Sequence, residues 1–188
     1  MTSHYVDLAV VPDVETSSAA LFGALYDRLH RYLARHHIER IGVSFPQYSV
    51  SPRTIGTILR VHGSAADLDQ LMAVDWQGGV RDHIRCAAIA AVPDLTLHRC
   101  IRRRQFKTGV ERLRRRRMKR RGETAEQAAV ALPDSAAEKP NLPYVHLRSS
   151  STGQSFCLFI AIGPLQPAPV GGPFNTYGLS DTSTIPWF

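Results

Sequence analysis

The segment GVERLRRRRMKRRG, residues 109–122, is the densest concentration of charge in the 188-residue chain. Eight of the ten residues from Arg112 to Arg121 are arginine or lysine. Residues 99–121 hold thirteen basic residues and one glutamate, a net charge of +12, whereas the rest of the chain holds ten basic and fifteen acidic residues. A mildly acidic protein that concentrates positive charge in one segment is expected to bind a polyanion.

The basic segment is rich in Arg, Leu, Met and Lys, which favour helices, so we expect a helix at about residues 110–121. Its few apolar residues form no continuous stripe, and arginines four residues apart repel one another, so this helix should be stable only against an anion. A solvated charged arm and a localisation signal remain alternative interpretations. Laid in a duplex groove, such a helix reaches phosphates on both strands, and arginine also forks onto guanine. Five basic residues share the expected groove face: Arg112, Arg115, Arg116, Lys119 and Arg120.

Three residues elsewhere carry groups suited to acid–base chemistry. His30 borders the apolar face of an expected helix, where most histidines are structural. Ser149 lies in a segment rich in Ser, Thr and Gly, which is most often only a turn. Tyr177 lies in the segment FNTYGLS, where a tyrosine more often packs than reacts. From position alone, each is a weak indication of catalysis.

The elements that must position these residues follow from hydrophobic periodicity. The first 92 residues read as strand, helix, strand, strand, helix, strand, the βαββαβ pattern of ferredoxin-like folds, among which RNA-binding domains of the RRM kind are one group. The expected fold class is α+β, with a ferredoxin-like domain at residues 1–95 and a smaller α+β domain at residues 96–188 that bears the Arg-rich helix. Strands are expected at 5–11, 40–45, 57–63 and 83–92, one helix at 18–36, and a short second helix after a capping box in which Ser64 is the N-cap and Asp67 its partner.

The second half is expected to contain a short Ala-rich helix at 123–132, a hairpin formed by YVHLRS and FCLFIAI, and a docked apolar tail, TIPWF. The three cysteines lie far apart with no C-x-x-C spacing, so neither a disulfide framework nor a zinc site is indicated. We expect no metal, no cofactor and a cytoplasmic location. The chain shows no signal peptide and no apolar run long enough to span a bilayer, so no membrane association is expected.

Taken together, several segments resemble the CRISPR-associated endoribonuclease of type I-F systems, which cuts the repeat RNA of a precursor transcript into guide RNAs. The resemblance covers essentially the whole chain. The segments that carry it are LHRYLARHHIERIGVSFP, GVERLRRRRMKRRGET, LRSSSTGQSFCLFI, GPLQ, TYGLS and the terminal PWF.

The resemblance implies a role for each matching residue. His30 matches the catalytic histidine, Ser149 the serine that aligns the nucleophilic ribose, and Tyr177 the tyrosine that orients the histidine. Phe156 matches an aromatic residue that stacks on a base of the RNA stem. The remaining expected RNA contacts are Arg103 and Gln105 near the bottom of the stem, Ser151, and Arg115, Arg116, Lys119 and Arg120 on the groove helix. Ser150, Arg121 and the loop at 166–173 depart from the family pattern, which affects the preferred repeat rather than the catalytic assignment.

The chemistry implied is metal-independent cleavage of a CRISPR repeat hairpin. RNA carries its own nucleophile, the 2′-hydroxyl, and histidine as a residue type has an ordinary pKa of about 6.5, which suits a general base. Attack on the adjacent phosphorus gives a 2′,3′-cyclic phosphate and a 5′-hydroxyl. The product hairpin is expected to stay bound within a guide-RNA complex with other type I-F subunits, the protein being a monomer on its own. An RNA scaffold without catalysis and a DNA-binding regulator are the alternatives.

Overall fold

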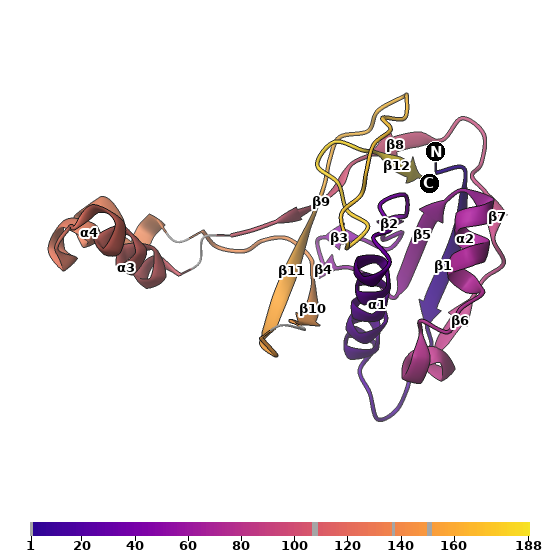
Figure 1. The fold of residues 1–188 in the computed structure, drawn as a ribbon, viewed down its shortest axis with the longest axis horizontal. Helices are drawn as coiled ribbons and strands as arrows, with labels where there is room; N and C mark the ends of the chain where they lie inside the picture. Colours follow the sequence, from indigo (N-terminus) through magenta and orange to yellow (C-terminus); the bar gives the residue numbers. More distant parts are fainter. Residues whose placement is uncertain (1, 107–108, 137, 150–151) are drawn as a thin grey trace. The chain divides into compact units, whose positions relative to one another are not determined.

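A computed structural model describes residues 2–106, 109–136, 138–149 and 152–188, and its fold class is α+β, as expected (Figure 1). It divides into two compact units, one made of Met1–Arg104 with Leu142–Phe188 and the other of Gln105–Asn141. The units do not follow the expected boundary after residue 95, because residues from both halves of the chain share one hydrophobic core. The division into two domains at that residue stays a prediction. Among the described residues, no helix has the length and apolar character needed to cross a membrane.

The main sheet of the first unit has the strand order β2-β5-β1-β6, with β7 also paired to β1 and every pairing antiparallel. Side chains alternate along β1, so Val6, Leu8 and Val10 are buried on one face. The helices α1 (Ser18–Arg35) and α2 (Ala65–Met72) lie over this sheet (Figure 1). The strands are β1 (His4–Val10), β2 (Gly42–Ser44), β5 (Ile58–Gly63), β6 (Ile84–Cys86) and β7 (Ala90–Ala91).

One expected element was wrong. The segment 83–92 is not a single strand: its first residue ends the 3₁₀ helix η1 (Gly78–His83), and the rest is split into β6 and β7. Both pieces lie along the same edge of β1, where β6 pairs near Val10 and β7 near His4. Alternating periodicity does not reveal such an interruption, because both halves keep the residue types of a strand.

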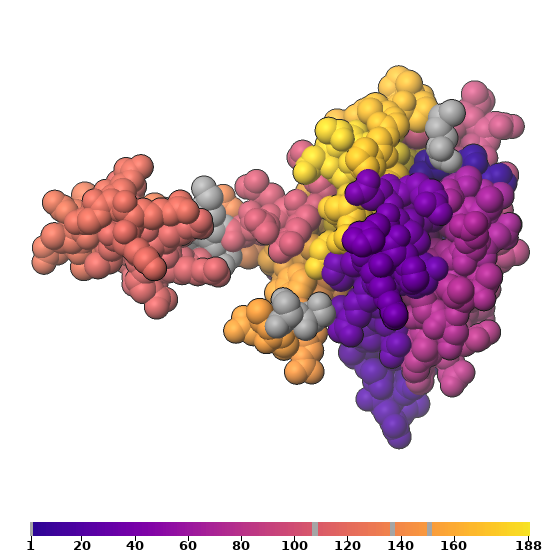
Figure 2. Space-filling model, in the orientation of Figure 1, coloured from indigo at the N-terminus to yellow at the C-terminus, as the bar shows by residue number. Residues whose placement is uncertain are grey.

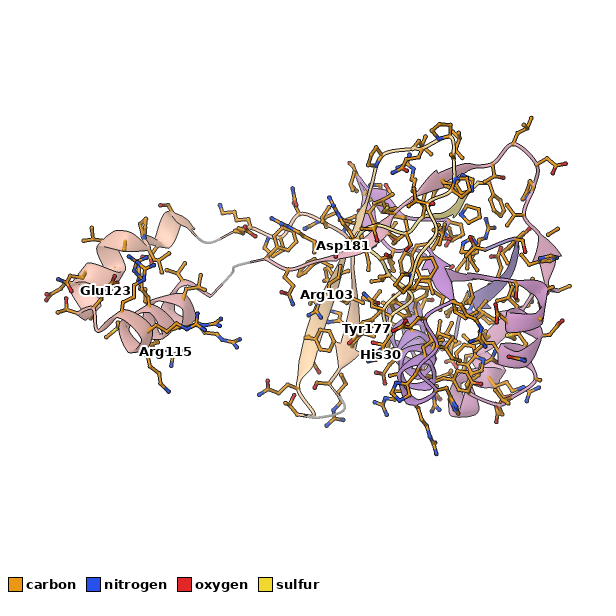
Figure 3. The ribbon with its side chains drawn as sticks, turned by 45° about the horizontal axis from the view of Figure 1, so that its top comes forward. His30, Arg103, Arg115, Glu123, Tyr177 and Asp181 are labelled. Atoms are coloured by element: carbon orange, nitrogen blue, oxygen red, sulfur yellow. The ribbon has the colours of Figure 1, made fainter. Side chains whose placement is uncertain are left out.

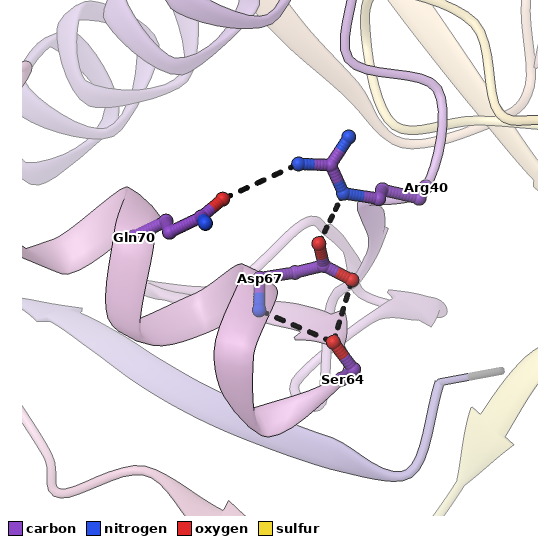
Figure 4. A network of polar contacts seen from close by, with 4 residues as sticks. All are labelled: Arg40, Ser64, Asp67 and Gln70. Carbon is purple, nitrogen blue, oxygen red and sulfur yellow. Dashed lines mark hydrogen bonds and ion pairs between the residues drawn. The ribbon is translucent and has the colours of Figure 1, made fainter.

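Side-chain caps begin both helices of this unit. Ser17 accepts a hydrogen bond from Ala20 N at the start of α1. At α2, Ser64 Oγ accepts from Asp67 N at 3.1 Å and donates to Asp67 Oδ2 at 2.6 Å (Figure 4). Arg40 also donates to the Asp67 carboxylate. Burial opposes ionisation of Asp67, but the bonds from Ser64 and Arg40 outweigh it and lower the pKa of this carboxyl. The predicted N-cap at Ser64 is therefore confirmed.

A second sheet has the order β10-β11-β9, and the expected hairpin corresponds to β10 and β11. Helix α1 approaches β10 so closely that a Cβ atom on Gly23 would lie 2.5 Å from the carbonyl oxygen of His146. The expected docked tail is confirmed, since β12 pairs with β8. These strands and the small hairpin β3–β4 are β3 (Ser49–Val50), β4 (Arg53–Thr54), β8 (Leu97–Arg99), β9 (Ile101–Arg104), β10 (Tyr144–Arg148), β11 (Ser155–Ile162) and β12 (Ile185–Trp187).

The second unit consists of the basic helix α3 (Val110–Arg121), α4 (Ala125–Ala131) and the 3₁₀ turn η2 (Asp134–Ala136). Gly122 ends α3 in the left-handed conformation, at φ 66°, and a capping box at Thr124 and Gln127 begins α4. The expected boundaries of the basic helix and the presence of a short helix after it are confirmed.

Two arginines hold the basic helix in place. The Arg114 side chain, only 16% exposed, pairs with Glu111 and Asp134 and donates to the carbonyl of Leu132. Arg117 pairs with Glu123. Val110 of α3 and Ala128 of α4 are buried. The expectation that only an anion could stabilise this helix was therefore incomplete, because part of its charge is neutralised within the unit itself.

We predict that Arg114→Ala loosens both helices of this unit, because it removes two ion pairs and the hydrogen bond to the α4 terminus. Amide hydrogen exchange at residues 110–131 should become faster in the free protein. Arg115→Ala is the matched control, since its neighbouring side chain is exposed. Equal exchange in the two variants would show that Arg114 does not hold the helix pair together.

Candidate active site

His30 lies on α1, two turns beyond Gly23, where the helix packs against β10. The imidazole is half-buried and stacks on the ring of Tyr177, with ring centroids 3.8 Å apart and planes at 5° (Figure 3). Its Nδ1 lies 3.0 Å from the carbonyl oxygen of Thr176. The stacked ring and the hydrogen bond together restrict rotation of the imidazole about both side-chain torsions.

The bond to Thr176 selects one tautomer of His30. A carbonyl oxygen only accepts hydrogen bonds, so Nδ1 must carry the proton. In the neutral ring, Nε2 then keeps its lone pair and is the atom able to take a proton from another group. The structure thus presents a histidine in an oriented form suited to general-base chemistry.

The turn that carries Tyr177 is tied to two other elements through successive carbonyl oxygens. Those of Thr176, Tyr177 and Gly178 accept hydrogen bonds from the His30 ring, the Tyr26 hydroxyl and Val43 N, respectively. Tyr26 is fully buried one helical turn before His30, so both side chains leave the same face of α1.

Asn175 holds the inside of the same turn. Its side-chain Oδ1 accepts from the backbone N–H groups of Tyr177 at 2.9 Å and Leu179 at 3.2 Å. Gly178 adopts φ 68°, and a Cβ at this position would lie 2.8 Å from Val43 Cγ1. The turn therefore requires glycine for both conformation and space.

Charged groups act on the Tyr177 hydroxyl from two sides. Burial raises its pKa, the Arg103 guanidinium lowers it, and the Asp27 carboxylate raises it, with a raised value as the net result. Tyr177 therefore stays a neutral hydroxyl near neutral pH. Arg103 lies on β9 with its guanidinium carbon 5.7 Å from the ring centroid of Phe156 on β11, within cation–π range. Figure 3 places Arg103, Tyr177 and His30 in the same region of the first unit.

The structure locates Ser149 directly after β10, in the turn that leads to β11. Its Oγ accepts from Thr152 N at 3.3 Å, and its backbone N–H and carbonyl bond to Gln154 and Gly153. These contacts lie within the turn, so the alignment of Ser149 with a ribose stays a prediction. Ser151, another expected RNA contact, lies outside the described residues.

Five expected RNA-binding residues lie on the exposed side of α3: Arg112, Arg115, Arg116, Lys119 and Arg120. The inward residues of this helix are the ones that pair within the second unit. Gln105 is exposed and belongs to that second unit, whereas Arg103 belongs to the first. RNA binding by these residues stays a prediction.

The chain is similar in sequence to a family of known proteins over almost its whole length. A family model described as "CRISPR-associated protein (Cas_Csy4)" matches residues 5–188. The chain is 45% identical over 185 residues to the "CRISPR-associated endonuclease Cas6/Csy4" of Pseudomonas aeruginosa (strain UCBPP-PA14), covering 98% of this chain and 99% of that protein. It is 43% identical, with the same coverage, to the protein of that name from Escherichia coli (strain UTI89 / UPEC).

The chain belongs to the Cas_Csy4 family. The resemblance inferred from the sequence segments is confirmed.

A second histidine–hydroxyl pair in this Cas_Csy4 chain is not a competing site: Ser44 Oγ and His62 Nε2 lie 2.8 Å apart, but both side chains are buried in the core. Burial, aided by Arg60, lowers the pKa of His62 to about 3. Among the described residues, no group of three His, Cys, Asp or Glu side chains is placed to hold a metal ion.

The sequence interpretation missed three contributors to the His30 environment: Tyr26, the Thr176 carbonyl and Asp27. A signal existed for Tyr26, because it lies four residues before His30 on the expected helix. Nothing in the sequence indicated the Thr176 carbonyl, since its partner is 146 residues away in the chain.

We predict that Gly178→Ala separates His30 from Tyr177. The left-handed conformation and the clash with Val43 should lower the free energy of unfolding by about 1–2 kcal/mol or more. The ring protons of His30 should then lose the ring-current shift that the stacked tyrosine causes, which NMR measures directly. Gly171→Ala is the control, since a Cβ there meets nothing within 4 Å. An unchanged His30 shift in Gly178→Ala would contradict this account of the turn.

Proposed function

We propose that this protein is a sequence- and structure-specific endoribonuclease that cleaves CRISPR repeat hairpins in precursor crRNA, without a metal ion, by attack of the 2′-hydroxyl. Membership of the Cas_Csy4 family supports action on CRISPR RNA, and both named relatives are called endonucleases. The main support for this mechanism is the hydrogen bond from His30 Nδ1 to the carbonyl oxygen of Thr176. This bond places the proton of the neutral ring on Nδ1, so that Nε2 is the atom that acts as the base.

In this mechanism, His30 Nε2 removes the proton from the 2′-hydroxyl, and the oxygen attacks the adjacent phosphorus. The 5′-oxygen leaves and takes up a proton from water, and His30 later returns its proton to solvent, so the products are a 2′,3′-cyclic phosphate and a 5′-hydroxyl. Tyr177 holds the imidazole in plane, and Ser149 holds the ribose in the attacking geometry. Orientation of this kind contributes several kcal/mol to the lowering of a reaction barrier.

Recognition of the stem involves both units. Phe156 stacks on a base at the bottom of the stem, beside Arg103, and Gln105 and Ser151 add contacts there. The exposed face of α3 enters the groove, with Arg112, Arg115, Arg116, Lys119 and Arg120 on phosphates and base edges. A-form major grooves are narrow, so the stem must be short enough for its groove to open near one end.

Contacts to the stem are the same before and after the cut. Such uniform binding raises affinity without raising turnover, so the hairpin product is retained. Retention suits a protein that is a monomer on its own and joins the other subunits of a type I-F guide complex through its RNA.

We also propose that residues 1–95 form a ferredoxin-like domain. The support is the strand order β2-β5-β1-β6 in a wholly antiparallel sheet, with α1 after the first strand and α2 after β5. This order corresponds to the βαββαβ connectivity, with the short hairpin β3–β4 as an insertion.

The proposed mechanism predicts one cut at the 3′ base of the host's repeat hairpin in the presence of EDTA. His30→Ala should reduce the cleavage rate by about 10²–10⁴-fold, the usual worth of a general base, and should change the Kd for the hairpin less than tenfold. Denaturing gels of the RNA and a binding titration measure the two quantities.

His37→Asn is the matched control, because His37 is exposed at the end of α1 with φ 51°, a conformation that asparagine tolerates. Activity that is lost in EDTA and restored by Mg²⁺ would contradict the metal-independent mechanism. A loss of affinity beyond tenfold in His30→Ala would assign His30 a structural role instead.

If α3 lies in the groove of the stem, substitutions of its basic residues should fall into two classes with different effects on binding. Arg115→Gln or Lys119→Gln should reduce the slope of log Kd against log salt by about one unit and weaken all stems alike. Arg116→Gln or Arg120→Gln should cost about 1–3 kcal/mol on the proper stem and relax discrimination among stems. If all four variants show the same small effect on every RNA, α3 does not read the groove.

A further inference from the structure

The solvent-facing side of α1 lines a hollow of about 630 Å³ in the first unit that the proposed function leaves unused. In Figure 2, the atoms of α1 are dark purple and form part of the surface of the first unit. The hollow is basic and aromatic at once. Its lining from α1 and the C-cap of that helix includes Arg28, Arg31, Tyr32, Arg35 and His36.

The far wall of the hollow comes from the segment between α2 and η1. Trp76 lines it, and its indole N–H is buried without a hydrogen-bond acceptor among the described residues. Gly78 leaves room for Arg28, since a Cβ there would lie 2.5 Å from the guanidinium. The Arg28 guanidinium therefore lies against the start of η1.

The two acidic groups of the hollow are already engaged. Asp27 pairs with Arg31 at 2.7 Å, and Asp75 accepts a hydrogen bond from Gly78 N. Three arginines on one helix stand out in the first unit, because outside residues 99–121 the chain holds ten basic and fifteen acidic residues. The Arg31 side chain is 55% exposed, so a phosphate can bind it from the solvent side while Asp27, whose side chain is 18% exposed, keeps its ion pair.

The arginines begin next to His30. At about 100° per residue, Arg31, Arg35 and Arg28 lie roughly 100° to 160° around α1 from His30, with Asp27 between. Asp27 also acts on the Tyr177 hydroxyl, so the hollow and the His30 site share this residue.

We propose that the hollow binds the single-stranded RNA immediately 3′ of the cut, with Arg28, Arg31 and Arg35 on phosphates and Tyr32 under a base. The inference rests on the proposed function, because the 3′ direction follows from His30 acting at the 3′ base of the hairpin. Arginines interleaved with accessible aromatic rings are the usual means of holding single-stranded nucleic acid without reading its sequence.

The test measures binding to the host's repeat hairpin with one deoxyribose at the cleavage position, which removes the nucleophile. Three RNAs are compared: the bare hairpin, the hairpin with a 3′ flank and the hairpin with a 5′ flank, each flank about eight nucleotides long. For the wild type, the 3′ flank should raise affinity about tenfold and steepen the salt slope by about two units, roughly 0.7 for each phosphate.

In Arg31→Gln/Arg35→Gln, the gain from the 3′ flank should fall to about twofold or less, and the salt slope should lose about 1.4 units. Both side chains are exposed, so the double variant leaves the core intact. Arg81→Gln/Arg85→Gln removes the same charge from exposed positions outside the hollow and should keep the gain. The deoxyribose keeps any effect of freeing Asp27 on catalysis out of the measurement.

Retention of the gain by the Arg31/Arg35 variant, or loss of a 5′-flank gain instead, would overturn the proposal. So would a wild type that gains nothing from either flank, which would make an acidic protein surface the better occupant of the hollow. Cleavage of the all-ribose hairpin that carries the 3′ flank is assayed alongside, because the cut needs the phosphodiester that joins the hairpin to this flank. If the wild type cuts it but gains nothing from the 3′ flank, this inference fails alone; if it does not cut, the proposed function fails on its own readout.

Discussion

The carbonyl oxygens of residues 176 to 178 connect a C-terminal turn to α1 and β2 at the point where the candidate chemistry lies. Through them, a helix formed early in the chain and a turn near its end become one rigid site. The middle bond comes from the fully buried Tyr26, and burial, with the nearby Tyr177, raises its pKa well above the ordinary tyrosine value. Tyr26 therefore remains a hydrogen-bond donor throughout the physiological pH range, and the orientation of His30 does not depend on titration of its support.

The packing of α1 explains why this turn can reach it. Gly23 lets the helix lie against the β10 backbone, and His30 follows two turns later on the same side. A bulkier residue at position 23 would push the helix away from the second sheet and move His30 with it. The side of α1 that faces the main sheet is fixed by ordinary core residues such as Leu25, Leu29 and Leu33. The geometry of the candidate site therefore derives from one helix held between two sheets, with only its third side left to solvent.

Local sequence was sufficient to predict three helices: α1 from its apolar periodicity, and α3 and α4 from runs of residues with high helix propensity. The β10–β11 hairpin was predictable for the same reason: its strands and its turn are adjacent in sequence. The break between β6 and β7 was not, since it depends on how both pieces meet the edge of β1. Nor was the Thr176 contact, because a backbone carbonyl has no residue type to reveal it. His30 itself was identifiable only through its family resemblance, and its position on the helix favoured a structural role.

The arginines of the two units have different structural roles, and the number of arginines in a segment does not by itself distinguish these roles. In α3, Arg114 and Arg117 form ion pairs with carboxylates of their own unit. The segment with the highest charge therefore has fewer side chains available to bind an anion than its composition suggests. In the first unit, Arg60 pairs with Asp7 and packs on aromatic rings, which makes it part of the structure. The arginines of α1 differ from both groups, because they line the hollow on the side of α1 away from the core, and only Arg31 has a carboxylate within ion-pair distance among the described residues. Arginines that pair within a unit stabilise its scaffold, whereas arginines left without a carboxylate partner at the surface keep their charge available to an anionic ligand.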